Sequence, residues 1–344
     1  EYNKSVRDFD IVTYDRVKRI YIEEDFAAWK EYAYHAQIHG AILAYLEIKK
    51  KNFYSIVSDV DGKRFVTARG WEDLSVVMKV YEKQGMPIDY DFIVQYLQDP
   101  EIARDFAVYY ELYRKYNQIY RVPELLEGTY PENVLSIQNA PFDEKLSLIG
   151  LLLDALGQEF VTYARSEAAQ KELLTQLGYL RMDLKEGRGD AKALLECQCD
   201  SHKTLTLHKK KAGLLSREEL RSAHDLELML DACISLVAEK GSGDVRTDFG
   251  LVKQYFDEQE EARQKQIVDA GRHLSNAFDF LSRVFGEGQE LVIFLSELSA
   301  GYYSLKFVSE CGNEEYYKYN RLLLLKDRSE ELTQEVMELL ALDD

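Results

Sequence analysis

The sequence predicts a mainly α-helical protein, in which an N-terminal part with a short strand segment precedes a helical bundle with long antiparallel helices. Apolar residues recur every three to four positions over long stretches, which is the spacing of one helical face. All five prolines lie between Pro87 and Pro141, and proline breaks helix interiors, so the chain beyond them favours helix. Hydrophobic residues make up 46% of the chain, which is enough to fill sizeable cores.

The N-terminal part is expected to contain short helices and strands. Asp25 precedes an apolar stretch, where its carboxylate would accept hydrogen bonds from the free N–H groups of a helix start. Pro100 fits the first turn of a helix, where the N–H that it lacks has no intrahelical partner. The expected elements are a strand at Arg19 to Ile22, helices from Asp25 to His35 and Ala41 to Lys49, a strand at Phe53 to Ser58 that turns at Asp61-Gly62, and helices at Arg69 to Lys83, Asp89 to Leu97 and Glu101 to Tyr116.

A boundary is expected between residues 120 and 142. The segment from Tyr120 to Asp143 holds three of the five prolines and Gly128, and its apolar residues follow no regular period. Such a segment is typical of a linker or an irregular strap. We therefore expect an N-terminal unit at 1–119, a linker at 120–142 and a helical domain at 143–344.

The helical domain is expected to contain longer elements. Ile267, Ala270, Leu274, Ala277 and Leu281 keep the helical spacing, and glycines after Phe285 are suited to ending that helix. The expected helices are Asp143 to Tyr163, Lys192 to Lys211, Arg217 to Glu239, Phe249 to Phe285, Gln289 to Val308, Glu314 to Leu325 and Ser329 to Leu342. Helices of this length favour a bundle with an elongated antiparallel pair.

Composition excludes several classes of protein. The formal net charge is −18, which argues against nucleic acid as a partner because such binding needs a basic face. The mostly apolar stretches are shorter than the roughly 18 residues of a membrane span, so no membrane is expected as a partner. Four cysteines in 344 residues do not form a disulfide scaffold, so a cytoplasmic protein is expected. The chain begins at Glu1 rather than methionine, which favours a fragment of a longer protein.

Catalytic and metal motifs are sparse. The sequence contains no G-x-x-x-x-G-K-[ST] phosphate loop, and Gly241-Ser242-Gly243 is expected to be a turn. Cys197, Cys199, His202 and His208 lie within twelve residues and have the ligand types of a zinc site. On a helix, however, positions two apart point about 200° from each other, so packing roles are favoured over metal binding. The acidic run Asp257 to Glu261 is expected to be a solvated face rather than the ligand set of a carboxylate metalloenzyme.

The N-terminal part resembles the end of a MoxR-like AAA+ ATPase module. Asp15-Arg16-Val17, ahead of the expected strand, is similar to the Asp-Arg-Phe that follows sensor 1 in this family, with valine in place of the aromatic residue. Thr67-Ala68-Arg69-Gly70-Trp71 is similar to the family's Thr-Pro-Arg-x-Trp element, with alanine in place of proline. The resemblance implies that the chain begins at the end of the AAA+ core and continues into the helical lid subdomain.

The C-terminal part looks like the helical extension of a bacterial branch of these ATPases. Three segments and a tyrosine-rich tail carry this resemblance. The segments are Phe142-Asp143-Glu144-Lys145, Lys211-Ala212-Gly213-Leu214-Leu215 and Phe285-Gly286-Glu287-Gly288-Gln289-Glu290. The resemblance thus extends over nearly the whole chain.

The resemblance implies roles for two arginines. Arg16 would be the arginine finger that reaches into a neighbouring subunit's site, and Arg69 would be sensor 2, which contacts the γ-phosphate of ATP in its own subunit. A guanidinium is always charged and can donate two parallel hydrogen bonds to phosphate oxygens. The parent protein would bind ATP and Mg, form a ring, expected to be a hexamer, and remodel a protein client, with a von Willebrand A domain protein as a partner.

The Walker A, Walker B and sensor 1 elements would lie before Glu1. We therefore expect that this chain alone binds no nucleotide stably and hydrolyses no ATP. The alternative hypothesis is a non-enzymatic helical scaffold that binds another protein and ignores nucleotide. In that case the two arginine motifs are accidental, and Arg16 and Arg69 are ordinary surface residues.

Overall fold

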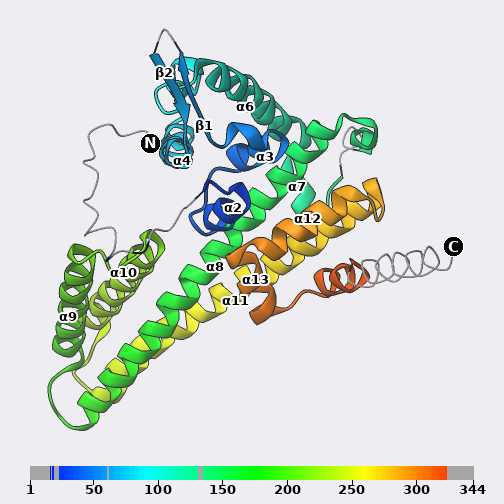
Figure 1. The fold of residues 1–344 in the computed structure, drawn as a ribbon. Helices are drawn as coiled ribbons and strands as arrows, with labels where there is room; N and C mark the ends of the chain where they lie inside the picture. Colours follow the sequence, from blue (N-terminus) through cyan, green and yellow to red (C-terminus); the bar gives the residue numbers. More distant parts are fainter. Residues whose placement is uncertain (1–15, 17, 19–22, 60–61, 131–134, 324–344) are drawn as a thin grey trace.

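The computed structural model describes residues 16, 18, 23–59, 62–130 and 135–323. These residues are mainly helical, and one two-stranded antiparallel sheet lies among them (Figure 1). The prediction of a mainly α protein is confirmed. The expected strand at Arg19 to Ile22 and the expected helix at Ser329 to Leu342 lie outside the described residues.

The N-terminal part follows the expected order of elements. Asp25 Oδ1 accepts hydrogen bonds from the backbone N–H groups of Ala27 and Ala28, at 2.8 and 3.2 Å, and so caps the helix at Phe26–His35 as predicted. The elements are α2 (Phe26–His35), α3 (Gly40–Ile48), the short 3-10 helix η1 (Lys50–Asn52), β1 (Ser55–Asp59), β2 (Gly62–Val66), α4 (Ala68–Gln84), α5 (Tyr90–Ile93) and α6 (Pro100–Tyr120). The β hairpin pairs Ser55 with Val66 and Asp59 with Gly62.

The helix expected at Asp89 to Leu97 is shorter in the structure. Asp89 caps α5 through the backbone N–H of Phe92, at 3.0 Å, but the helix ends at Ile93. Further along, the carbonyl of Gln98 accepts a hydrogen bond from the N–H of Phe65 in β2, at 3.1 Å. Because Gln98 is paired with the hairpin, and because Pro100 disfavours helix in the residue before it, the chain leaves the helical path before α6 begins.

The segment between residues 120 and 142 is partly helical. It contains α7 (Val122–Leu126) and the 3-10 helix η2 (Leu135–Asn139). The side chains of Val122, Leu125 and Ile137 are buried, and α7 packs against α8 and α11. The main hydrophobic core contains residues from both sides of this segment and from the segment itself. The chain between the two expected domains therefore contributes to the interior.

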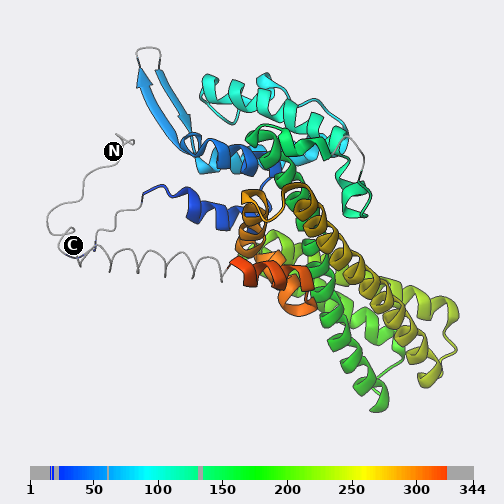
Figure 2. The same ribbon diagram turned by 90° about the vertical axis from the view of Figure 1, so that its right-hand side faces the viewer.

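Two long antiparallel helices form the axis of the molecule. α8 (Phe142–Lys185) and α11 (Val245–Phe285) lie side by side in Figure 1 and in the rotated view of Figure 2. α8 extends well past the expected end at Tyr163, because its apolar stripe continues and packs against α9 (Ala191–Lys211) and α10 (Arg217–Lys240). A second hydrophobic core, which includes Leu180, Leu230 and Val252, occupies this far end.

The expected single helix at Gln289 to Val308 is wrong. The structure has α12 (Gln289–Ala300) and α13 (Tyr302–Cys311), with a bend of 88° between them. At the break the hydroxyl of Ser304 donates to the carbonyls of Leu298, at 2.5 Å, and Gly301, at 2.8 Å. Gly301 fits there because a Cβ would lie 2.4 Å from the Ser304 hydroxyl oxygen. Residues 314–323 form a further helical segment.

By length and composition alone, α8 is apolar enough to cross a membrane. In the structure 56% of its most apolar stretch is buried inside the protein. The bent pair of α12 and α13 also passes the same test when it is counted as one span. α8 packs against α3, α6 and α11. Its apolar face is therefore explained by its position as a core helix.

Candidate functional site

Arg69 lies in the first turn of α4. Thr67 caps this helix, and its hydroxyl oxygen accepts a hydrogen bond from the N–H of Gly70 at 3.3 Å. The Arg69 side chain is 89% exposed, and its Nε lies 3.6 Å from a carboxylate oxygen of Asp73 one turn later. Ion pairs of this exposed kind contribute little to stability. The guanidinium is thus held at the surface with little of its hydrogen-bonding capacity used.

The start of α4 is firmly anchored below that surface. Trp71, two residues after Arg69, is fully buried. Its indole N–H donates to the backbone carbonyls of Asn52 and Phe53, at 3.3 and 3.2 Å. Leu74 and Met78, on the same face of α4, are fully buried as well. The helical spacing therefore places Arg69 on the exposed side of a helix whose other side is fixed in the core.

Arg16 is exposed, and its neighbours Asp15 and Val17 lie outside the described residues. A finger residue and a sensor residue would serve the sites of different subunits, so the proposed roles do not require them to meet.

The four residues considered for zinc all lie on α9. Cys199 is buried, with its sulfur 3.4 Å from a carboxylate oxygen of Asp231, whereas Cys197 is exposed. His202 Nδ1 lies 3.7 Å from Glu227, and His208 is in the last turn. Within the described part of the chain, no group of three or more His, Cys, Asp or Glu side chains is arranged to hold a metal ion. Opposite exposure of the two cysteines agrees with the expected divergence of positions two apart on a helix.

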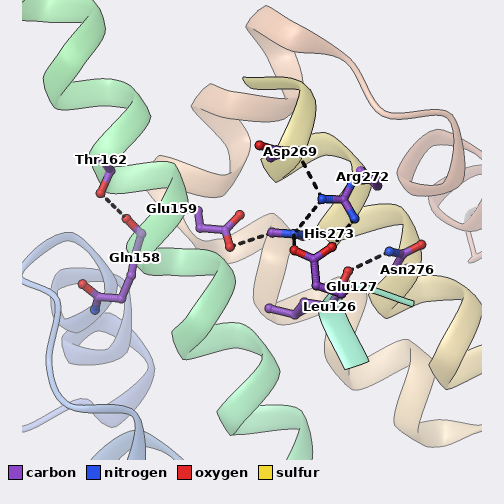
Figure 3. A network of polar contacts seen from close by, with 9 residues as sticks. All are labelled: Leu126, Glu127, Gln158, Glu159, Thr162, Asp269, Arg272, His273 and Asn276. Carbon is purple, nitrogen blue, oxygen red and sulfur yellow. Dashed lines mark hydrogen bonds and ion pairs between the residues drawn. The ribbon is translucent and has the colours of Figure 1, made fainter. Parts of the chain in front are cut away.

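A histidine clamped between two carboxylates joins three helices (Figure 3). His273 of α11 places Nδ1 2.8 Å from Glu159 of α8 and Nε2 3.1 Å from Glu127, which directly follows α7. Arg272 also donates to Glu127. Hydrogen bonds from Arg272 and then from His273 lower the pKa of Glu127 to about 2. Because both ring nitrogens already face carboxylates, this network is suited to holding helices together rather than to proton transfer.

No protein-family model, no curated protein and no solved structure matches the chain. Of the polar groups described above, the Arg69 guanidinium combines high exposure with a rigid support. Such a group suits a phosphate ligand, because its fixed fork of N–H donors loses little freedom on binding.

A cavity of about 120 Å³ lies where α2, α3, α8 and the bend between α12 and α13 meet. Its lining is largely apolar, with Leu43, Ile149 and Ile293 among the side chains. Lys30 donates to Glu47, at 2.7 Å, and also to Glu297. The cavity could not be predicted from the sequence, because its walls come from segments as far apart as residues 30 and 304. The one local signal is a pair of glycines, Gly150 and Gly157, inside the apolar stripe of a long helix.

Proposed function

We propose that this chain is the C-terminal portion of a MoxR-like AAA+ ATPase that couples ATP hydrolysis to the remodelling of a protein client. Residues 1–119 would be the end of the AAA+ core and the lid subdomain, and residues 143–344 the helical extension. The observation that carries the proposal is Arg69, whose exposed guanidinium lies in the first turn of a helix anchored by buried Trp71. The segment Thr67-Ala68-Arg69-Gly70-Trp71 resembles a sensor 2 element, and this resemblance implies that the Arg69 guanidinium contacts the γ-phosphate of ATP.

Two features of the α4 start favour contact with a phosphate. The first N–H groups of a helix lack intrahelical partners, and the helix dipole favours negative charge there. The guanidinium of Arg69 adds a full positive charge and a fork of donors. In phosphoryl transfer a protein acts mainly by positioning the reactants and stabilising developing charge. An arginine on an anchored helix would contribute to both effects once its guanidinium contacts the phosphate.

The rest of the ATP site would come from outside the chain. Mg-ATP would be held by Walker A and Walker B elements, which the sequence lacks, and Arg16 of a neighbouring subunit would complete the site. The proposal therefore includes a ring, which we expect to be a hexamer, and a cytoplasmic location. The net charge of −18 suits contacts with protein partners, such as a von Willebrand A domain protein, better than contacts with nucleic acid.

The test is ATP hydrolysis by the complete protein that carries this chain, with Arg69→Ala compared with the unaltered protein. Losing one preorganised donor to the transferring phosphate is expected to lower turnover on the order of 10²-fold or more. Arg246→Ala is the matched control, because Arg246 is also the exposed second residue of a helix, α11. Unchanged turnover in Arg69→Ala would remove the sensor role. A complete protein with no nucleotide-dependent activity would leave the alternative, a helical scaffold.

A further inference from the structure

The cavity between α2, α3, α8 and the α12–α13 bend has a distinctive charge balance. One lysine and three carboxylates line it: Lys30, Glu47, Asp154 and Glu297. Lys30 pairs with Glu47 and Glu297, so the cation is already matched. Lys50, which lies outside the lining, also pairs with Glu47, at 2.9 Å. Within the described residues, Asp154 is therefore the carboxylate of the lining that no lysine reaches.

Asp154 lies in the middle of the cavity face of α8 and is half-buried. Within the described part of the chain, its carboxylate takes part in no hydrogen bond or ion pair. Gly150 lies one turn before Asp154, where a Cβ would lie 3.1 Å from the Cβ of Ala44, and Gly157 lies one turn after it, on the open side. A Cβ placed on Gly157 would meet no atom within 4 Å. A half-buried carboxylate beside an apolar wall, with no cation of its own, is free to pair with a cation that enters the cavity.

A second polar group without a partner lies beside Asp154. The Tyr113 hydroxyl is buried and has no hydrogen-bond partner among the described residues. A Cβ on Gly40, another lining residue, would lie 2.8 Å from this hydroxyl and 2.9 Å from the Cβ of Asp154. Burial, together with the charge of Asp154, raises the pKa of Tyr113, so its hydroxyl stays neutral. The Asp154 side chain and the Tyr113 hydroxyl therefore both lie close to Gly40, which lines the cavity.

The other side chains of the cavity are suited to contact with the apolar part of a ligand. Leu153, Ile293 and Leu298 contribute aliphatic surface, and Tyr302 and Tyr303 contribute aromatic rings. An apolar protein cavity of roughly 150 Å³ accommodates a benzene molecule, so about 120 Å³ is of the size of one small ring or a short alkyl chain. Tyrosine rings also attract organic cations through their π faces.

We propose that this cavity is a binding site for a small organic ammonium ion, with Asp154 pairing with the ammonium group and the aliphatic and aromatic walls enclosing its apolar body. This site is separate from the proposed ATP site at Arg69. It lies between the N-terminal helices α2 and α3 and the later helices α8, α12 and α13. A bound cation would therefore contact both parts of the chain.

The test measures the affinity of the full chain for three probes of similar shape by isothermal titration calorimetry. The probes are benzylammonium, benzyl alcohol and benzoate, which differ mainly in charge. Benzylammonium is expected to bind most tightly and benzoate least. Asp154→Asn is expected to weaken benzylammonium about tenfold or more, as for loss of a charge-assisted hydrogen bond, while it changes benzyl alcohol about twofold or less.

A cavity-filling variant tests the location. Gly157→Leu places a side chain in the open space of the cavity and is expected to abolish binding of benzylammonium and of benzyl alcohol. Gly178→Leu is the matched control, because Gly178 lies on an exposed part of the same helix and its Cβ would also meet no atom within 4 Å. If Gly157→Leu does not fold, as judged by circular dichroism, the affinity of Asp154→Asn for benzylammonium still tests the proposal. The proposal is overturned by no binding of benzylammonium, by benzoate binding as tightly, or by unaltered affinity in Asp154→Asn or in folded Gly157→Leu.

Discussion

The rings of Trp71 and Phe106 meet edge to face, with their centroids 5.2 Å apart and an angle of 85° between their planes. Aromatic pairs favour this geometry because the positive edge of one ring faces the negative face of the other. The contact joins the first turn of α4 to α6 and, together with the indole hydrogen bonds, fixes the helix start that carries Arg69. Trp71 therefore both stabilises the fold and fixes the helix that carries Arg69.

Trp71→Ala is expected to destabilise the protein by about 3–5 kcal/mol, because it removes a large, fully buried ring and its packing against Phe106. The free energy of unfolding is measured by urea titration followed by circular dichroism. Tyr179→Ala, which removes an aromatic side chain that is 55% exposed on α8, is the control. A loss for Trp71→Ala no larger than that for Tyr179→Ala would show that Trp71 does not anchor α4.

The contribution of Glu127 to stability is expected to depend on pH. Its folded pKa, about 2, lies below the ordinary value of 4.5. Since the folded pKa is the lower one, the contribution is present above about pH 4.5 and is lost as pH falls towards 2. The difference in urea midpoint between the unaltered protein and Glu127→Gln is therefore expected to be larger at pH 7 than at pH 3.

The control for the pH series is Glu111→Gln, since Glu111 is an exposed residue of α6 outside the His273 network. Its urea midpoint is expected to stay close to that of the unaltered protein at pH 7. If the Glu127→Gln difference were the same at pH 7 and pH 3, the ion pairs with Arg272 and His273 would not stabilise the fold.

The cysteines are expected to differ strongly in reactivity. Burial raises the pKa of Cys233 to about 12 and also raises that of Cys199, whereas Cys197 is exposed. The thiolate is the reactive form, so native protein treated with iodoacetamide is expected to be labelled first at Cys197. Cys233 is expected to react only after unfolding in urea. Peptide mass spectrometry over a time course reads out each site, and equal labelling of Cys233 and Cys197 in the native protein would contradict the described packing of α9 and α10.

Much of the fold could be predicted from local patterns. Asp25, Pro100 and the periodic apolar residues around Leu274 each act within one turn of helix, so their effect is visible in the sequence. The continuation of α8 past Tyr163 and the break at Gly301 depend on contacts between helices and could not be predicted from local patterns. Leu173 and Leu180 are buried because α9 and α10 return to cover them, and the bend at Gly301 is held by hydrogen bonds of the Ser304 hydroxyl.

The candidate sites also differ in how far they could be predicted from the sequence. Arg69 could be singled out from the sequence because its motif is continuous, and its role as sensor 2 stays a prediction. The structure adds that its helix is anchored by the buried Trp71. The His273 network could not be found, because Glu127, Glu159 and His273 are brought together only when α7, α8 and α11 pack. The cavity beside Asp154 likewise exists only between elements that are distant in sequence. Patterns within one helix can be read locally, whereas contacts between helices depend on packing geometry.

The proposed roles of Arg16 and Arg69 predict complementation between inactive subunits. A subunit with Arg16→Ala keeps its own sensor but supplies no finger, and a subunit with Arg69→Ala keeps its finger but has a defective site. Each homogeneous assembly of the complete protein is expected to hydrolyse ATP slowly. Mixed assemblies are expected to regain part of the activity, because some intact sites then meet intact fingers. No recovery on mixing, with assembly verified by size-exclusion chromatography, would argue against a finger acting between subunits.

The most direct test of the ATPase proposal is the ratio of ATP to ADP affinity in the complete protein with and without Arg69. If the Arg69 guanidinium contacts the γ-phosphate, Arg69→Ala is expected to weaken ATP binding about tenfold or more and to leave ADP binding nearly unchanged. The measurement is fluorescence competition with a labelled nucleotide, in the presence of Mg and with Arg246→Ala as the control. Equal affinities for ATP in the unaltered protein and in Arg69→Ala, or an equal loss for ATP and ADP, would contradict the proposed role of Arg69.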